Sequence, residues 1–528
     1  MMRREISLSE TIQMTFITEN EKQERQEIRV THDSDVTLMT TLLKKKLISG
    51  NFCGGKGTCG RCRVRFMQAA PVPTGLERQV FAPDELRLGY RLACMARPKN
   101  DCAVQSAFVQ PRPIEILTDL SDVIAASEKD DHISQKEKTE KRYLIAVDLG
   151  TTTIAMRLMD IDSGRAADTC CALNPQRSYG ADVLSRIQAA NAGQAEALRE
   201  SVWEVLMEGV GRFRRFCRAA GQETSICCMC VAGNTTMEHL LMGLSTEGLG
   251  KSPFAPEKLG LQKCVLPDGA MPVYVTPGIS AFVGGDIVAG LYTLKMLPLF
   301  SGNIPQGTAV LFIDLGTNGE LALTDGKRML VTAAAAGPAF EGGSGRAVAG
   351  SDMIALAASL LKEGVIDESG LMAGPYFEEG ITLPLPGEAK GNDSADASVS
   401  AASIRLTQKD IRDLQMAKAA VRAGVDILCR KMGFPEISQV CLAGGFGYYL
   451  DVDAAAAIGL LPESLKSCTK AVGNTALAGA FHMGKDLWTG KLREGMLDEM
   501  LQGIESINLA EQEEFAELYI RYMNLESS

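Results

Sequence analysis

The sequence predicts a multidomain protein of α+β and α/β class, with a small N-terminal domain, a charged connector and a larger two-part core. Three observations predict this division. Three cysteines crowd a glycine-rich segment, a charge-rich stretch follows them, and one strand-and-turn motif occurs twice beyond that stretch. The chain of 528 residues is long enough for about three or four domains.

Composition excludes several classes of function. The chain has 54 basic and 65 acidic residues and a formal net charge of -11, whereas nucleic-acid binding requires a positive surface, so we expect no nucleic-acid partner. No apolar run reaches the ~18 residues of a membrane span, and no export signal opens the chain. We therefore expect no membrane association and a cytoplasmic location.

Five segments are expected along the chain. Alternating apolar positions around Ile28 and Val30 predict strands near the start. Residues 121–142 hold many charges and few large apolar side chains, which predicts a flexible linker, and the residues after Asn508 predict a terminal amphipathic helix. The expected boundaries are 11–110 for the N-terminal domain, 111–142 for the linker, 143–305 and 306–500 for the two core subdomains, and 501–528 for the C-terminal helix.

The chain has fifteen cysteines and no export signal, so we expect no disulfide framework, because the cytosol keeps thiols reduced. Cys53, Cys59 and Cys62 are spaced C-x5-C-x2-C in NFCGGKGTCGRC, where the glycines let backbone amides approach the sulfurs. As the fourth thiolate we choose Cys94, in GYRLACMA, over Cys102, which stands in a predicted strand. The thiols of ICCMCVAG are expected to be core side chains.

This arrangement resembles the adrenodoxin-like ferredoxins, whose three-plus-one thiolates bind a 2Fe-2S cluster. The resemblance implies a β-grasp, ferredoxin-like domain with a cluster on Cys53, Cys59, Cys62 and Cys94. Zinc is disfavoured because a structural zinc site would more often use two C-x2-C pairs or a Cys/His mixture. A four-iron cluster is disfavoured because two successive two-residue gaps are absent.

Three glycine-rich turns mark the part of the chain beyond the linker: DLGTTT from Asp148, DLGTNGE from Asp314 and AGGFG from Ala443. Each one alone can be no more than a tight turn. In this order, however, they can present backbone N–H groups and hydroxyls to phosphates, and the two aspartates can hold Mg2+ through water. The sequence therefore predicts a phosphate-binding core.

The series resembles the acetate and sugar kinase, Hsp70 and actin superfamily, in which two such hairpins clamp a triphosphate. The resemblance implies a two-lobed actin-like (ribonuclease H-like) ATPase core that binds ATP and Mg2+, with Asp148 and Asp314 serving the metal. The expected nucleotide-binding residues are Gly150, Thr151 and Thr152 in the first loop, Gly316, Thr317, Asn318 and Gly319 in the second, and Gly444, Gly445 and Phe446 in the adenosine turn.

Asp286, in GISAFVGGDIVAG, is a third candidate catalytic carboxylate. It can orient the attacking water, or it can be an acidic residue that satisfies free amides at a helix N-terminus. Glu341, in GPAFEGGSG, can face either the nucleotide or a partner. The residues alone leave both questions open.

The domain order, with GYRLAC, DLGTTT, AGNTTM, GGDIVAG, DLGTNGE and AGGFG, is similar to the reductive activators of corrinoid-dependent methyltransferases. The resemblance implies an ATP-dependent reductive activase that passes single electrons through the 2Fe-2S cluster and reduces inactive Co(II) corrinoid to Co(I). The expected partners are a corrinoid protein of a methyltransferase system and an electron-donating ferredoxin, flavodoxin or reductase. Whether the active unit is a homodimer is left open.

Three other functions stay in view. An ATP-driven activator of a radical dehydratase would share the ATP fold, but relatives of that type hold a four-iron cluster between subunits, unlike the N-terminal cysteine loop here. A non-redox ATP-dependent clamp would use the cluster as a sensor. A hydantoinase-like hydrolase would share the DLGTTT-type turns and leave the ferredoxin-like domain without a purpose.

Overall fold

The computed structural model describes residues 11–19, 25–45, 47, 57, 62–107, 141–180, 182–219, 224–297, 304–316, 318–336, 350–384, 403–444, 447 and 450–526. Most of the predicted linker lies outside these residues; only its last two positions, 141 and 142, are described. The chain forms two compact units. One consists of residues 1–114 with 175–186 and 343–347, and the other holds the rest.

A five-stranded sheet forms the framework of the first unit. The strand order is β2-β1-β5-β3-β4, with β1 and β5 parallel and all other neighbours antiparallel. This is the β-grasp arrangement, so the predicted ferredoxin-like class is confirmed. The elements are β1 (Thr11–Glu19), β2 (Arg25–Asp33), α1 (Leu38–Lys44), β3 (Arg63–Phe66), α2 (Gly75–Val80), α3 (Pro83–Arg87), β4 (Tyr90–Leu92) and β5 (Cys102–Ser106).

Periodicity explains how this sheet gains its core. Met14 and Phe16 alternate along β1, so both face the same side of the sheet, and each is about 1 % exposed. Leu38 and Leu42 are four residues apart on α1 and both are fully buried. The helix therefore packs one apolar face on the sheet, in a core that also contains Cys62 and Cys94.

Two six-stranded sheets of one design form the second unit. Five strands of each sheet follow the same plan. The first three in the chain pair antiparallel, and two later strands extend the sheet beyond the first of these three and run parallel to it. The orders are β10-β11-β9-β6-β7-β8 and β18-β17-β12-β13-β14-β19. This duplication is the two-lobed, ribonuclease H-like core expected from the sequence. "First lobe" and "second lobe" denote below the parts of the chain built on these two sheets.

The strands of the first lobe are β6 (Lys141–Leu149), β7 (Thr153–Asp160), β8 (Ala166–Leu173), β9 (Thr224–Gly233), β10 (Gln262–Val265) and β11 (Pro272–Val275). Those of the second lobe are β12 (Thr308–Leu315), β13 (Gly319–Thr324), β14 (Met329–Ala334), β17 (Glu436–Ala443), β18 (Thr469–Gly473) and β19 (Ile504–Ser506). A separate two-stranded ribbon joins β15 (Ile381–Pro384) to β16 (Ser403–Leu406).

The α-helices that follow in the chain are α5 (Val183–Ala189), α6 (Ala195–Ala219), α7 (Thr235–Met242), α8 (Gly285–Thr293), α9 (Gly350–Lys362), α10 (Tyr376–Glu379), α11 (Gln408–Met432), α13 (Val452–Ala457), α14 (Thr475–Thr489), α15 (Glu494–Gln502) and α16 (Phe515–Arg521). Short 3-10 or π turns lie at Pro175–Ser178, Ala190–Gln194, Glu247–Leu249, Glu463–Cys468 and Leu509–Glu511. Within the described residues, no helix combines the length and apolarity that a membrane crossing requires.

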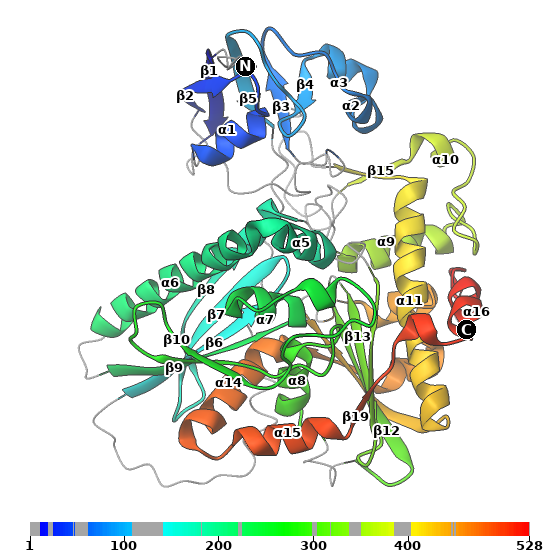
Figure 1. Ribbon diagram of the computed structural model, residues 1–528. Helices are drawn as coiled ribbons and strands as arrows, with labels where there is room; N and C mark the ends of the chain where they lie inside the picture. Colours follow the sequence, from blue (N-terminus) through cyan, green and yellow to red (C-terminus); the bar gives the residue numbers. More distant parts are fainter. Residues whose placement is uncertain are drawn as a thin grey trace, which may run out of the picture. The chain divides into compact units, whose positions relative to one another are not determined.

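Helices α8 and α14 cross at small residues, and this crossing joins the two lobes (Figure 1). A Cβ placed on Gly479 of α14 would overlap the carbonyl oxygen of Ala289 on α8. A Cβ on Gly290 would lie 2.7 Å from Oγ1 of Thr475. Helix α14 follows β18 of the second lobe and packs on β6 and β9 of the first, so it connects the two sheets.

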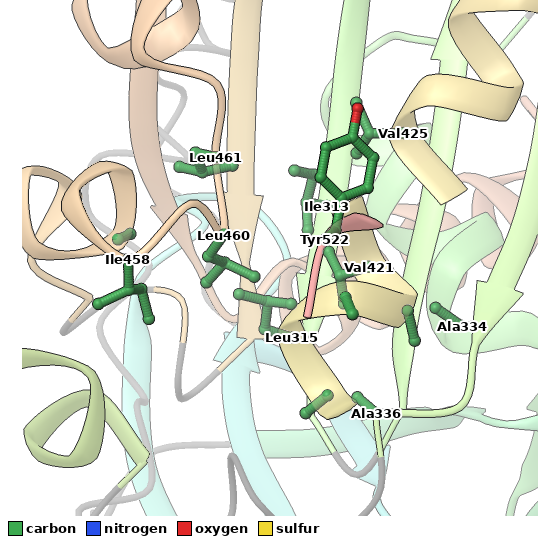
Figure 2. Close-up of a cluster of buried hydrophobic side chains, with 14 of the residues drawn as sticks. Ile313, Leu315, Ala334, Ala336, Val421, Val425, Ile458, Leu460, Leu461 and Tyr522 are labelled. Carbon is green, nitrogen blue, oxygen red and sulfur yellow. The ribbon is translucent and has the colours of Figure 1, made fainter. Parts of the chain in front are cut away.

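The long helix α11 supports the first hairpin of the second lobe. Val421 is fully buried, and a Cβ on Gly319 at the start of β13 would lie 2.7 Å from its Cγ2. Figure 2 shows Val421 and Val425 of α11 in one apolar cluster with Ile313 and Leu315 of β12. The close approach fixes the hairpin directly above the helix.

The C-terminal segment differs from the single helix expected over 501–528. Residues 504–506 instead form β19, which pairs with β14, and the helix is confined to α16. The edge of the sheet explains the difference, because β14 supplies backbone partners such as the Val331 carbonyl, which accepts from Ile507 N at 2.8 Å. An edge strand offers hydrogen bonds that an isolated helix end lacks.

Candidate functional site

Two of the four predicted cluster cysteines lie side by side in the first unit. The Sγ atoms of Cys62 and Cys94 are 3.3 Å apart, and the residues are 2 % and 3 % exposed. The backbone joins them as well, because Ala93 N donates to the Cys62 carbonyl at 2.7 Å. The two thiols therefore face one point from separate segments of the chain.

The turn that carries Cys94 is fixed from two sides. On one side, the N-terminus of α1 donates from Leu38 N to the Ala96 carbonyl at 2.9 Å and from Met39 N to the Ala93 carbonyl at 2.8 Å. On the other side, the buried carboxylate of Glu77 accepts from Leu92 N at 2.7 Å. These bonds hold the turn before any cluster is bound.

Cys53 and Cys59 lie outside the described residues. Cys102 is part of β5 and pairs with Met14 of β1, and burial, followed by the charge of Asp101, raises the pKa of its thiol to about 11. A thiol that resists ionisation is a poor cluster ligand, since the thiolate is the form that binds metal. The donor set at Cys62 and Cys94 fits a cluster, and the identity of all four ligands stays a prediction.

The first predicted phosphate loop connects β6 to β7 and is held by side-chain amides. Asp148 is the last residue but one of β6, and its Oδ2 accepts from Asn474 Nδ2 at 2.8 Å. The Gly150 carbonyl accepts from Asn174 Nδ2 at 2.8 Å, and Oγ1 of Thr151 accepts from Asn234 Nδ2 at 3.0 Å. The Thr152 carbonyl accepts from the backbone N–H of Asn174 at 2.9 Å.

The second predicted phosphate loop connects β12 to β13. It closes through Gly316 N, which donates to the Asn318 carbonyl at 2.9 Å. Of the predicted adenosine turn, the structure describes Gly444, which lies against the same hairpin: it has a φ of +86°, and a Cβ there would lie 2.5 Å from Oδ1 of Asp314 and 2.7 Å from the Leu315 carbonyl. Only glycine fits both this backbone conformation and this contact.

Asp286 lies in the first turn of α8, and its Oδ1 accepts from Ile287 N at 2.8 Å. Gly284, the residue before the helix, packs so closely on Asn234 that a Cβ would lie 2.5 Å from its Cα. Asp286 therefore makes the contacts expected of an acidic residue at a helix N-terminus. Its role in orienting an attacking water stays a proposal. The same packing brings α8 to the first phosphate loop.

The three aspartates are close enough to influence one another. Burial raises the pKa of Asp148 to about 6, against the hydrogen bond from Asn474. Burial raises the pKa of Asp286 to about 7, with a further contribution from the charge of Asp148. Burial, followed by the charges of Asp286 and Asp148, raises the pKa of Asp314 to about 8. Clustered, poorly solvated carboxylates of this kind are typical of functional sites and attract cations.

Two glutamates lie behind these aspartates, and the sequence did not single them out. Glu238 is 3 % exposed and Glu320 is 8 % exposed. Burial, followed by the charge of Asp286, raises the pKa of both well above the usual value. Glu238 accepts from Thr276 Oγ1 at 3.2 Å and from the backbone beside α8, so it fixes the start of that helix.

Three asparagines, Asn174, Asn234 and Asn474, were given no role from the sequence, although Asn234 stands in the AGNTTM motif. A signal for two of them exists, because Gly-Asn-Thr follows a strand both at 233–235 and at 473–475. Predicted residues Thr317, Gly445 and Phe446, together with Glu341, lie outside the described residues. Within the described part, no three carboxylate, thiol or imidazole groups are arranged to hold a metal ion alone, so Mg2+ here would need phosphate or water ligands too.

Comparisons with known families agree along most of the chain. Residues 21–99 match the 2Fe-2S iron-sulfur cluster binding domain, and residues 143–298 match the RACo middle region. Residues 308–347 and 345–528 match the C-terminal domain of RACo, the ASKHA domain, which is the superfamily of acetate and sugar kinases, Hsp70 and actin. The three matches follow the order of the sheets.

Individual relatives share this layout. The corrinoid activation enzyme RamQ of Eubacterium limosum is 29% identical over 469 residues, which cover 80% of this chain and 76% of that protein. The [Co(II) methylated amine-specific corrinoid protein] reductase of Methanosarcina barkeri is 22% identical and covers 72% of this chain and 76% of its own. A solved reductive activator for corrinoid, iron-sulfur protein has the same fold, with a TM-score of 0.61 and 23% identity over 97% of this chain and 98% of that chain.

The fold and the matched domains thus lead to one family. The chain belongs to the RACo family of reductive activators of corrinoid proteins, in which a 2Fe-2S domain precedes an ASKHA domain.

Proposed function

We propose that this protein uses ATP to drive the reduction of an inactive Co(II) corrinoid, held on a partner protein, to the Co(I) state. The observation that carries the proposal is the joining, in one chain, of a thiol pair in a ferredoxin-like domain with two Asp-Leu-Gly-Thr hairpins whose aspartates influence each other. The relatives named for corrinoid activation and corrinoid protein reduction support it.

The proposed cluster ligands are Cys53, Cys59, Cys62 and Cys94. A bound 2Fe-2S cluster supplies one-electron transfer. The chain's own part is to hold the thiols at a fixed separation and away from water, which the burial of Cys62 and Cys94 supports. The turn at Cys94 is already held by α1 and Glu77, and this fixed backbone lowers the reorganisation that accompanies cluster binding.

The proposed nucleotide site uses the two hairpins and the adenosine turn. Its residues are Gly150, Thr151 and Thr152, then Gly316, Thr317, Asn318 and Gly319, then Gly444, Gly445 and Phe446. Asp148 and Asp314 are proposed to hold Mg2+ through water, and Asp286 to orient the attacking water. The raised pKa values of these carboxylates support a cation site, since a bound cation relieves their mutual repulsion.

Electron transfer through the cluster and ATP binding by the core are linked by energetics. For one electron, each ~59 mV uphill lowers the equilibrium yield of reduced acceptor tenfold. ATP can offset this only if it binds one conformation more tightly than another, since a ligand shifts an equilibrium by its differential affinity. A two-lobed core with a helix crossing between its lobes is suited to such a change.

The proposal includes partners and location. The electron donor is a low-potential ferredoxin, flavodoxin or reductase, the acceptor is the corrinoid protein of a methyltransferase system, and the site of action is the cytoplasm. The proposed domain limits are 11–110, 111–142, 143–305 and 306–500, and the residues after 500 add β19 to the sheet of the second lobe.

The test combines purified protein, a Co(II) corrinoid protein and a titanium(III) or ferredoxin reductant, and follows Co(I) absorbance. Co(I) should form rapidly only when ATP is present. Cys94→Ser should abolish both the cluster's visible absorbance and Co(I) formation, while the matched Cys102→Ser should preserve both. If no corrinoid protein yields ATP-dependent Co(I), the proposed function is wrong; if Cys102→Ser rather than Cys94→Ser bleaches the spectrum, the fourth ligand is wrong.

A further inference from the structure

Three asparagine side chains donate to successive parts of the first phosphate loop, and they start from three different elements. Asn174 follows β8 and donates to the Gly150 carbonyl, while Asn234 follows β9 and donates to Oγ1 of Thr151. Asn474 follows β18 and donates to Oδ2 of Asp148. The loop is therefore held at its carboxylate, its backbone and its hydroxyl by one kind of group.

Two of these amides are fixed by the helices that they begin. Asn234 is the N-cap of α7, and its Oδ1 accepts from Met237 N at 3.0 Å. Asn474 is the N-cap of α14, and its Oδ1 accepts from Leu477 N at 2.8 Å. Because the oxygen of each side chain is committed to its own helix, the direction of the NH2 group is set by the fold.

The three donors differ in the lobe from which they come. Asn174 and Asn234 leave strands of the first lobe, so their bonds to the loop stay within that lobe. Asn474 leaves a strand of the second lobe and is 7 % exposed, so its bond to Asp148 crosses between the lobes. Asn474 begins α14, which follows a strand of the second lobe and packs on β6 and β9 of the first, so this bond lies at the junction of the two lobes, whereas the other two lie within the first lobe.

We propose that Asn474 is a positioning residue that couples the second lobe to Asp148, whereas Asn174 and Asn234 only fix the loop within its own lobe. This inference rests on the proposed binding of ATP at that loop. Asn474 places the Asp148 carboxylate when the lobes meet and releases it when they part. Asn234 holds the loop ready for phosphates in either arrangement.

Serine substitutions separate capping from positioning. Serine is a good N-cap, so N474S and N234S should keep α14 and α7 while each removes the amide donor. Asn508 offers a matched control: its Oδ1 caps a 3-10 turn by accepting from Ala510 N at 3.2 Å, and its Nδ2 donates to Glu511 Oε1 at 2.8 Å. N508S therefore loses the same kinds of bond away from the loop.

The readouts are the equilibrium dissociation constant for ATP and the kcat of ATP hydrolysis. Losing a hydrogen bond to a charged group is worth about tenfold or more, so N474S should lower kcat by about that factor while the dissociation constant changes by less than about threefold. N234S should show the opposite split, with weaker ATP binding and a smaller loss of kcat. N508S should match the wild type in both.

Amide exchange in the nucleotide-free protein adds a readout that does not depend on turnover. The loop at 149–153 should exchange faster in N234S, because a bond within the lobe is lost, and should change less in N474S. If N474S does not fold, N474D replaces it, since aspartate keeps the cap and the volume and sets a carboxylate against Asp148; its kcat should fall further.

The outcomes separate the two levels of the proposal. The coupling role would be overturned if N474S and N234S changed kcat and the dissociation constant for ATP in the same proportion, or if N474S behaved like N508S. Either result would leave ATP use intact. A wild-type protein that neither binds nor hydrolyses ATP would instead overturn the proposed function.

Discussion

The two Asp-Leu-Gly-Thr hairpins share a sequence and a strand pairing, yet the fold holds them in different ways. The β6–β7 loop is held by polar groups, with Asn474 on Asp148 and Asn234 on Thr151. The β12–β13 loop is held by packing, with Val421 beneath Gly319 and Gly444 against Asp314. A polar contact depends on orientation, whereas packing depends on shape, so we expect the β6–β7 hairpin to be the adjustable one and the β12–β13 hairpin to be the rigid one.

The largest effect is expected at the rigid hairpin. Gly444→Ala would force an alanine into a left-handed conformation and put its Cβ 2.5 Å from Asp314 Oδ1. We expect a loss of roughly 2–4 kcal/mol in the free energy of unfolding and at least tenfold weaker ATP binding. Gly490→Ala is the control, because Gly490 has a φ of +76° with nothing within 4 Å of its Cβ position. If both variants bound ATP equally well, the close contact between Gly444 and Asp314 would not contribute to ATP binding.

The second-largest effect is expected where α8 and α14 cross between the two lobes. Gly479→Ala would drive a methyl group into the Ala289 carbonyl and separate α14 from α8. We expect a loss of about 1–3 kcal/mol in the free energy of unfolding, measured by urea denaturation. Gly495→Ala, on α15 with nothing within 4 Å, should instead be neutral or stabilise by about 0.4–1 kcal/mol. Similar changes for both would mean that the helices do not meet as described.

Asp148 and Asp314 give the two hairpins different pH dependences of stability. Folding raises the pKa of Asp148 to about 6 and that of Asp314 to about 8, so the folded, nucleotide-free protein binds more protons than the unfolded chain across this range. Its free energy of unfolding should therefore fall as the pH rises from about 4 toward these values.

Neutral variants test this sign. Asp314→Asn should flatten the fall up to about pH 8, by on the order of 1–2 kcal/mol after allowance for solvent screening, while Asp148→Asn should flatten it only below about pH 6. The measurement is urea denaturation at a series of pH values without nucleotide. Curves that stay parallel to the wild type would contradict the proposed difference between the two loops.

The smallest effect concerns the helix under the rigid hairpin. Val421→Ala removes two buried methyl groups beside Gly319 and should cost about 1–2 kcal/mol of unfolding free energy, with weaker ATP binding. Val425→Ala removes the same groups one turn along α11, where burial is similar. It should cost as much stability and leave ATP binding unchanged; weaker binding in both would show that stability alone explains the loss.

Local signals in the sequence were sufficient for the fold class and for the two hairpins of the candidate site. An apolar strand followed by Asp-Leu-Gly-Thr identifies Asp148 and Asp314, because strand and turn are encoded within about ten residues. The C-terminal segment was harder, since the pairing of β19 with β14 depends on an edge that forms far away in the sequence.

The asparagines show where sequence reasoning ended. Asn474 reads as an ordinary N-cap, and nothing next to it indicates Asp148, which lies 326 residues earlier. Glu238 and Glu320 likewise gain meaning only when α7, α8 and β13 meet and exclude water around them. Contacts of this range follow from tertiary packing and not from local pattern.

The decisive experiment measures the yield of Co(I) on a corrinoid protein at a fixed reductant potential, with ATP, with ADP and without nucleotide. We predict near-complete Co(I) with ATP, little without nucleotide, and none with Cys94→Ser under any condition. Equal Co(I) yields with and without ATP would contradict the claim that the two-lobed core drives the reduction.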